Sequence, residues 1–299
     1  MSGALQARIE AELASPAPEA VRALAEALAQ PGDAAVLYYG STLRTGDLSG
    51  ILDFYRLTKG PHRRGPRGWV ERLLWPEVSY HEVGDLKAKV ATLPLATFRR
   101  AAEGRTLDTT IWARFVQPCQ RVWSAEAASA EAAAQAVTAA VVTASRFAAA
   151  LGPAKGPALA FWGALFRKTY AAEFRVETTD RADTVVGHGE GRYAEILPLA
   201  WAVGGVAFTV DGQDLAPRKA GLPGWTLPSL AGKPLNVLRI LKAAFTFDGA
   251  ARYAAYKIAR HTGVEIEVTP FRERHPFLAA PGAWLELRRR QRELAAAGK

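Results

Sequence analysis

The sequence contains a single cysteine, Cys119, and only five histidines among its 299 residues. One cysteine excludes an internal disulfide and a cysteine-rich metal site, and the histidines lack the spacing of metal ligands. The longest uncharged apolar run, residues 196–210, is interrupted by Pro198 and two glycines. It is shorter than the roughly 18 residues of a membrane-spanning helix. The first 30 residues also lack the apolar region of a secretory leader. We therefore expect a cytoplasmic protein that is soluble or peripheral to a membrane.

Acidic residues are too few to balance the basic ones, because 29 Asp and Glu face 38 Lys and Arg, a net charge of +9. The excess lies in two segments. Residues 56–72 hold six basic residues and one acid, and residues 271–299 hold seven basic residues and three acids. Either segment alone fits an ordinary solvated surface. Together they favour an acidic partner, which is a nucleotide, a nucleic acid or an anionic membrane.

The hydrophobic pattern predicts helices mixed with short strands, which is an α+β fold. Two segments rich in glycine and proline, residues 59–68 and 211–234, are expected to be loops. Residues 196–210 are expected to form core strand or turn. The expected helices lie at residues 18–29, 94–103, 124–151, 158–174, 236–244, 248–261 and 282–297, and the expected strands at 34–39, 50–57, 78–83, 87–92 and 264–268.

A glycine-serine turn and an aspartate follow one another on two adjacent predicted strands. Gly40 and Ser41 end the first strand, and Asp53 lies 12 residues after Ser41 on the next. This is the arrangement of nucleotidyltransferases that resemble DNA polymerase β. The turn lets backbone N–H groups and a hydroxyl approach a triphosphate, and the carboxylate holds Mg²⁺. An ordinary turn followed by a surface aspartate fits the same residues.

The pattern is incomplete at the metal. Most such enzymes carry a second carboxylate two residues after the first, and Tyr55 stands at that position here. Either another part of the chain completes the metal site or the protein is catalytically inactive.

Six sequence blocks, taken in order, resemble the mitochondrial phosphatidate cytidylyltransferase family, the translocator assembly and maintenance proteins. The resemblance covers roughly residues 34–260. The family's His and Asn residues after the aspartate strand have no clear counterpart, which leaves the lipid acceptor and the nucleotide base open. The blocks are YYGSTLR (38–44), ILDFYRL (51–57), LKAKVATLPL (86–95), TIWARFVQPCQRVW (110–123), RKTYAAEFRVE (167–177) and LKAAFTFDGAARYAAYKIAR (241–260).

That family transfers CMP from CTP to phosphatidic acid, which gives CDP-diacylglycerol and pyrophosphate. It needs Mg²⁺ and works as a peripheral membrane enzyme. The resemblance implies a polymerase-β-like nucleotidyltransferase domain at residues 1–123. A mainly helical, winged-helix-like domain at residues 124–270 would contribute to the active site. Residues 271–299 would form a basic amphipathic helix.

The resemblance also implies a role for individual residues. Gly40 and Ser41 would hold the triphosphate and Asp53 the metal. Glu173 would supply the missing carboxylate, although without the resemblance a salt bridge to Arg175 at a helix end is the favoured explanation. The cations expected to bind the nucleotide phosphates are Arg114, Arg175, Lys242 and Lys257, with Lys242 also expected to act in catalysis. An exposed helix lysine remains the alternative for Lys257, and a buried partner of an acid for Arg114.

The C-terminal segment has the composition of a membrane-contacting helix. Trp284 can enter the lipid interface, and Arg288, Arg289 and Arg290 can meet anionic headgroups. The alternative is a helix packed on the body with a solvated basic face. The expected function is a CTP-dependent cytidylyltransferase acting on a phosphorylated lipid at the inner face of a membrane.

Two alternatives to this function remain open. One is transfer to another acceptor, such as phosphorylated ceramide, RNA or protein, and the other is a catalytically inactive lipid- or nucleotide-binding module. Nucleic acid is the less expected partner, because the sequence lacks interleaved aromatic and basic residues.

Overall fold

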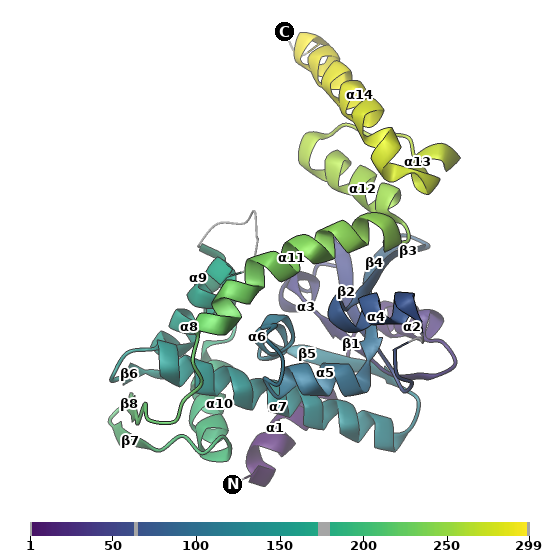
Figure 1. Ribbon diagram of the computed structural model, residues 1–299. Helices are drawn as coiled ribbons and strands as arrows, with labels where there is room; N and C mark the ends of the chain where they lie inside the picture. Colours follow the sequence, from purple (N-terminus) through teal and green to yellow (C-terminus); the bar gives the residue numbers. More distant parts are fainter. Residues whose placement is uncertain (1, 63–64, 173–179, 298–299) are drawn as a thin grey trace.

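The computed structural model describes residues 2–62, 65–172 and 180–297. It confirms an α+β protein built on a mixed five-stranded sheet (Figure 1). The strand order is β3-β4-β2-β1-β5, and β2 and β4 are its parallel pair. The strands of this sheet are β1 (Asp33–Tyr39), β2 (Ile51–Thr58), β3 (Glu77–Val83), β4 (Leu86–Pro94) and β5 (Cys119–Ser124).

Fourteen helices and a small second sheet surround these strands in the described residues. The second sheet joins β6 (Gly156–Pro157), β8 (Asp214–Pro217) and β7 (Phe208–Asp211) in that order. The helices are α1 (Ser2–Leu13), α2 (Glu19–Leu28), α3 (Ser41–Thr45), α4 (Pro66–Leu73), α5 (Leu95–Ala102), α6 (Thr110–Phe115), α7 (Ala127–Leu151), α8 (Ala158–Ala172), α9 (Asp180–Gly187), α10 (Glu190–Val203), α11 (Thr226–Thr246), α12 (Ala250–Thr262), α13 (Pro270–Arg274) and α14 (Pro276–Ala297).

The main sheet is buried on both faces at β1, and β1 accordingly consists of nearly continuous apolar residues. All seven residues of β1 are buried. Because successive side chains in a strand point to opposite faces, Leu37 and Tyr39 join the core under α5, α6 and α7. Val36 and Tyr38 join a second core, which α2 covers.

The alanine-rich helix α7 lies at the centre of the larger core. It packs against α5 and α6, which precede residue 124 in the sequence, and against α8 and α10, which follow it. One hydrophobic core therefore runs across the domain boundary expected at residues 123–124. Among the described helices, α7 alone has the length and composition to cross a membrane, but 61% of its apolar window is buried within the protein. Core helices of folded domains share this property.

Three sequence predictions are wrong. Residues 196–210 are mostly helix α10, and residues 211–234 are not a loop throughout, because β8 and the first half of α11 lie within them. Pro228 falls in the first turn of α11, where its missing N–H costs no helical hydrogen bond. Residues 264–268 lie in no strand. Val264 and Ile266 are buried and alternate with the exposed Glu265 and Glu267. Apolar and polar residues therefore alternate here as in a strand, although this segment pairs with no strand among the described residues.

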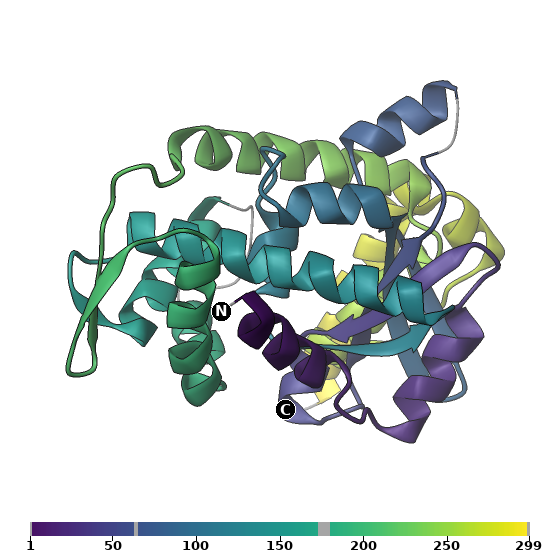
Figure 2. The ribbon, with the colours of Figure 1, turned by 90° about the horizontal axis from the view of Figure 1, so that it is seen from below.

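The last helices extend from the sheet toward the C-terminus. Figure 1 shows α11 crossing the front of the molecule from α8 to the sheet, with α12 above the sheet and α14 projecting away. The predicted helix 282–297 is part of α14, which begins earlier and contains Pro281 in its interior. Figure 2 shows α11 along one edge of the molecule, with α4 beside its C-terminal end and the β7–β8 hairpin on the side where α11 begins.

A substitution within the shared core tests whether the regions on either side of residue 124 unfold together. Trp112 of α6 is fully buried and stacks on Phe147 of α7, with the ring centroids 4.7 Å apart. We expect Trp112→Ala to lower the free energy of unfolding by about 3–5 kcal/mol, in one transition measured by urea denaturation and circular dichroism. The exposed Leu107→Ala serves as the control. Two separate transitions, only one of them shifted, would contradict a shared core.

Candidate functional site

The turn after β1 brings the backbone into close contact with Asp53. Tyr39 pairs with Asp53 in the antiparallel β1–β2 register. The next residue, Gly40, has a φ of 98°, which is a left-handed conformation that favours glycine. A Cβ atom added to Gly40 would lie 2.9 Å from Oδ2 of Asp53. Both the backbone conformation and the contact therefore require glycine at this position.

A lysine from the neighbouring parallel strand pairs with the same carboxylate. The β2–β4 register places Lys89 beside Asp53, and its Nζ lies 2.7 Å from Oδ1 of Asp53. Burial lowers the pKa of Lys89, but the negative charge of Asp53 and the nearby phenol groups outweigh this effect and hold the pKa above its ordinary value. Lys89 is therefore a fixed positive charge beside the carboxylate.

Helix α12 closes the site from above, although it lies about 200 residues away along the chain. The backbone N–H of Tyr80 on β3 donates to the carbonyl of Asp248 at 2.9 Å, just before α12 begins. Farther along the helix, the hydroxyl of Tyr256 donates to the carbonyl of Ser49 at 3.3 Å. These contacts, one to β3 and one to the residues just before β2, hold α12 at the sheet end beside Asp53.

The sheet end, α3 and α12 together enclose a cavity of about 370 Å³. Three cations line it, one from β4 and two from α12, against two carboxylates. The lining residues are Ser41, Thr42, Thr45, Asp47, Gly50, Ile51, Asp53, Lys89, Tyr253, Lys257 and Arg260. A polar cavity with excess positive charge and hydroxyl groups is suited to a ligand carrying several negative charges, such as a polyphosphate.

The donor set fits a metal only in part. In the described part of the chain, no group of three or more His, Cys, Asp or Glu side chains could hold a metal. Mg²⁺ in proteins is commonly held by one or two carboxylates together with phosphates of the substrate. Asp53, with Asp47 in the same lining, therefore fits a magnesium ion that arrives with a polyphosphate.

The structure brings together four of the residues expected from the sequence. Ser41, Asp53 and Lys257 line the cavity, and Gly40 lies against Asp53. Glu173 and Arg175 lie outside the described residues, so the candidate second carboxylate is not placed.

Two other expected phosphate ligands are not among the described residues that line the cavity. The Nζ of Lys242 on α11 donates to the carbonyl of Leu74 at 2.8 Å. Arg114 donates to the hydroxyl of Tyr55 at 2.8 Å and also lies over the Tyr39 ring. The Lys242 contact connects α11 to the end of α4. The Arg114 contacts hold the rings of Tyr39 and Tyr55 in place.

Sequence reasoning missed two of the three cations in the cavity. Arg260 lies seven residues after Tyr253 and three after Lys257, on one helix face, so helical spacing could have found it. Lys89 carried no such signal. Its position depends on the parallel pairing of β2 with β4, which a sequence does not specify.

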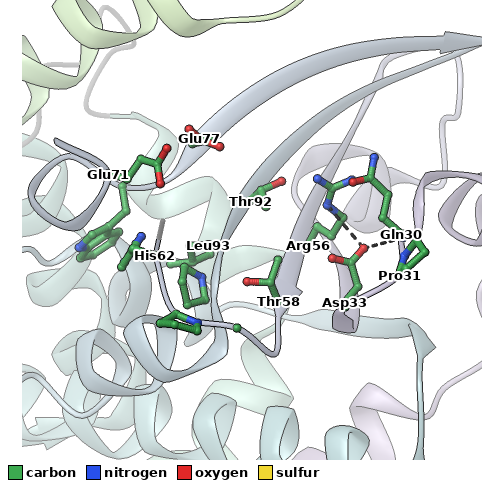
Figure 3. Close-up of a pocket in the computed structure, with 15 residues that line it drawn as sticks. Gln30, Pro31, Asp33, Arg56, Thr58, His62, Glu71, Glu77, Thr92 and Leu93 are labelled. Atoms are coloured by element: carbon green, nitrogen blue, oxygen red, sulfur yellow. Dashed lines mark hydrogen bonds and ion pairs between the residues drawn. The ribbon is translucent and has the colours of Figure 1, made fainter. Parts of the chain in front are cut away.

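A second cavity, of about 330 Å³, lies at the opposite end of the main sheet (Figure 3). Asp33 accepts a hydrogen bond from the backbone N–H of Gln30 at 2.7 Å and lies 3.6 Å from Arg56. Glu71 and Glu77 lie at the other side of this cavity, near His62. Its lining holds three carboxylates, Asp33, Glu71 and Glu77, against the guanidinium of Arg56. This negative excess disfavours a polyphosphate, which makes the Asp53 cavity the stronger candidate for such a ligand.

No family model matches this chain, and no curated protein is significantly similar to it. The case for a function accordingly comes from the residues around Asp53.

Replacing Gly40 tests whether the close contact with Asp53 organises the cavity. We expect Gly40→Ala to destabilise the fold by about 1–3 kcal/mol from backbone strain, with a further loss because the new Cβ displaces Asp53. Binding of tripolyphosphate, measured by titration calorimetry, should weaken as well.

Gly32→Ala is the matched control for this experiment. Gly32 has nearly the same φ, 92°, but an added Cβ would have no neighbour within 4 Å. It should show the backbone strain without the loss of binding. Equal effects of the two substitutions on stability and on binding would contradict a special role for the Gly40–Asp53 contact.

Proposed function

We propose that the protein is a Mg²⁺-dependent nucleotidyltransferase that transfers CMP from CTP to a phosphorylated lipid, most simply phosphatidic acid. The observation that carries the proposal is the convergence of the Gly40–Ser41 turn, Asp53 and three cations on one cavity. The choice of CTP and of a lipid phosphate comes from the resemblance of the sequence blocks to phosphatidate cytidylyltransferases. The products would be CDP-diacylglycerol and pyrophosphate.

The proposed reaction exchanges one phosphoanhydride bond for another. A phosphate oxygen of the lipid attacks the α-phosphorus of CTP, and the bond from that phosphorus to the oxygen bridging to the β-phosphate breaks. Pyrophosphate leaves with the electron pair of the broken bond. Lys257 and Arg260 are suited to bind the triphosphate and to offset the charge that builds on the leaving group.

Asp53 and Lys89 would divide the remaining tasks. Asp53, with the triphosphate oxygens, would hold Mg²⁺, which supplies charge neutralisation at the phosphates when bound. Lys89 fixes the orientation of the Asp53 carboxylate through the 2.7 Å contact. Ser41 offers a hydroxyl at the start of α3, next to the backbone that Gly40 keeps free of a side chain.

The domain assignment belongs to the same proposal. Residues 1–123 would form the nucleotidyltransferase domain, and residues 124–270 a mainly helical, winged-helix-like domain that contributes α12 to the site. The β7–β8 hairpin is compatible with the wing of such a domain.

We also propose that the C-terminal helix contacts an anionic membrane. Trp284 on α14 is exposed, and the guanidinium of Arg288 lies 4.9 Å from the centroid of its ring. Arg289 and Arg290 lie on the same helix. Under this proposal the enzyme would work at the inner face of a membrane, where its lipid substrate would reside.

A catalytically inactive nucleotide-binding module is the second candidate. It is favoured by the contact of Lys89 with Asp53 and by the small number of carboxylates in the described lining. Such a module would bind CTP through the same cations without releasing pyrophosphate.

Release of pyrophosphate from CTP, with and without phosphatidic acid, separates these candidates. We expect lipid-dependent release by the wild-type protein and a loss of at least about 100-fold in Asp53→Asn, because charge stabilisation at the phosphates contributes at least this much. CTP binding without release would favour the inactive module. Release of pyrophosphate from ATP with RNA, and none from CTP with lipid, would indicate that the acceptor is RNA and not a lipid phosphate.

Removing the cations of α12 tests which side chains bind the triphosphate. We expect Lys257→Met and Arg260→Met each to raise the Kd for CTP about tenfold or more, because one charge-assisted hydrogen bond is worth about 1.5–3 kcal/mol. Lys155→Met removes the same charge from an exposed residue paired with Asp211 and is the control. An equal effect of all three variants would mean that only the net charge matters.

A further inference from the structure

Helix α11 turns two of its three cations toward the protein and most of its large aliphatic side chains toward solvent. This is the reverse of the pattern expected for a helix on a protein surface. On the inner side, Arg239 forms an ion pair with the buried Asp108, and its guanidinium lies 4.7 Å from the centroid of the Trp75 ring. Lys242, also on this side, donates to the carbonyl of Leu74. These contacts fix the rotation of the helix.

A glycine brings the inner side of α11 close to the body of the protein. A Cβ added at Gly232 would lie 2.5 Å from the carbonyl oxygen of Ala172, the last residue of α8. The helix therefore packs by close backbone approach at this point and by ion pairing near Arg239. Its aliphatic side chains take little part in the packing.

Those aliphatic side chains form a stripe along the outer side of α11, with exposed fractions between 46% and 68%. They repeat at helical spacing over four turns. The stripe consists of Leu227, Leu230, Val237, Leu238, Ile240 and Leu241. Large contiguous apolar patches are rare on soluble proteins and indicate contact with a partner or a membrane.

Helix α4 extends this apolar face. Trp69 and Leu73 are about two-thirds exposed, and Val70 is also exposed. The bond from Lys242 to the Leu74 carbonyl holds the end of α4 against α11. Figures 1 and 2, viewed at right angles, both place α4 beside one end of α11 and on the same side of the molecule. We call the stripe of α11, together with Trp69, Val70 and Leu73, the α4–α11 face.

The charges around the α4–α11 face are positive. Helix α11 contains no acidic residue, and its Lys233 is exposed within the stripe. The one acid of α4, Glu71, is buried, while Arg72 is exposed. An apolar surface with an exposed tryptophan and basic residues is complementary to an anionic bilayer.

A second copy of the chain is a poorer partner for this face. In a twofold dimer the same patch would lie on both sides of the interface. Lys233 and Arg72 would then face one another without an exposed acid in either helix to balance them. An anionic bilayer meets the same residues with opposite charge.

We propose that the α4–α11 face lies on an anionic lipid bilayer, with its aliphatic side chains and Trp69 in the interface and Lys233 and Arg72 at the headgroups. This contact is separate from the one proposed for α14. The choice of a bilayer rests on the proposed function, because a lipid substrate brings the protein to a membrane. Binding is nevertheless measurable without nucleotide, so either proposal can fail alone.

Flotation with vesicles of phosphatidylcholine and phosphatidylglycerol tests the proposal on the full chain, without CTP or phosphatidic acid. We expect Leu230→Glu/Leu241→Glu to lower the partition coefficient at least tenfold. Trp69→Glu/Leu73→Glu, on the other helix, should do the same. Val210→Glu is the matched control, since Val210 is equally exposed but lies on β7, away from the face. Circular dichroism should show wild-type stability for all variants, because every replaced side chain is exposed.

Deletion of residues 281–299 separates this surface from α14. The truncated protein should still bind vesicles, and the Leu230→Glu/Leu241→Glu change made in the truncated protein should remove this binding. Wild-type binding by both double variants would overturn the proposal, as would an equal loss in Val210→Glu. Light scattering provides a further test, because it measures whether the protein is a dimer. If the wild-type protein is a dimer that Leu230→Glu/Leu241→Glu dissociates, and neither protein binds vesicles, the face contacts a second copy of the chain. That result would overturn the proposal of a bilayer contact.

Discussion

The close contact of Gly40 with Asp53 is the constraint on which the candidate site depends. It exists because β1 ends at Tyr39, the residue paired with Asp53, and because glycine at the next position allows both the left-handed backbone and the 2.9 Å approach. Lys89 then holds the carboxylate from the other side. The turn after β1, together with β2 and β4, thus positions the partly buried carboxylate of Asp53 at the end of the sheet.

The same sheet explains how distant parts of the chain reach this carboxylate. The bond between Tyr80 and Asp248 and the one between Tyr256 and Ser49 hold α12 across the strand ends. Helix α11 leads to α12 and is itself held by Arg239 and Lys242, whose partners lie in the sheet half of the molecule. Two of the three cations of α11, Arg239 and Lys242, are thus used to dock the helix, and this orientation leaves its aliphatic stripe facing outward.

Much of the sheet, and half of the site, could be predicted from the sequence. The apolar runs of β1 and β2 and the Gly40–Ser41 turn have local signals, and so does Asp53. Lys89 had none, because its place depends on pairing between strands that are distant in sequence. The start of α11 was missed because its prolines suggested a loop. Residues 264–268 were predicted as a strand because their apolar residues alternate with polar ones, but in the structure they pack in this pattern without forming a strand. Glu173 and Arg175 lie outside the described residues and stay predictions.

The central claim is that a nucleoside triphosphate binds between the Gly40–Ser41 turn and α12. A crystal structure of the protein with CTP and Mn²⁺, which shows anomalous scattering, tests it most directly. The account predicts the triphosphate within reach of Ser41, Lys257 and Arg260, with the anomalous peak beside Asp53. Nucleotide bound in the cavity of Asp33 and Arg56, or a triphosphate bound away from Asp53, would contradict it.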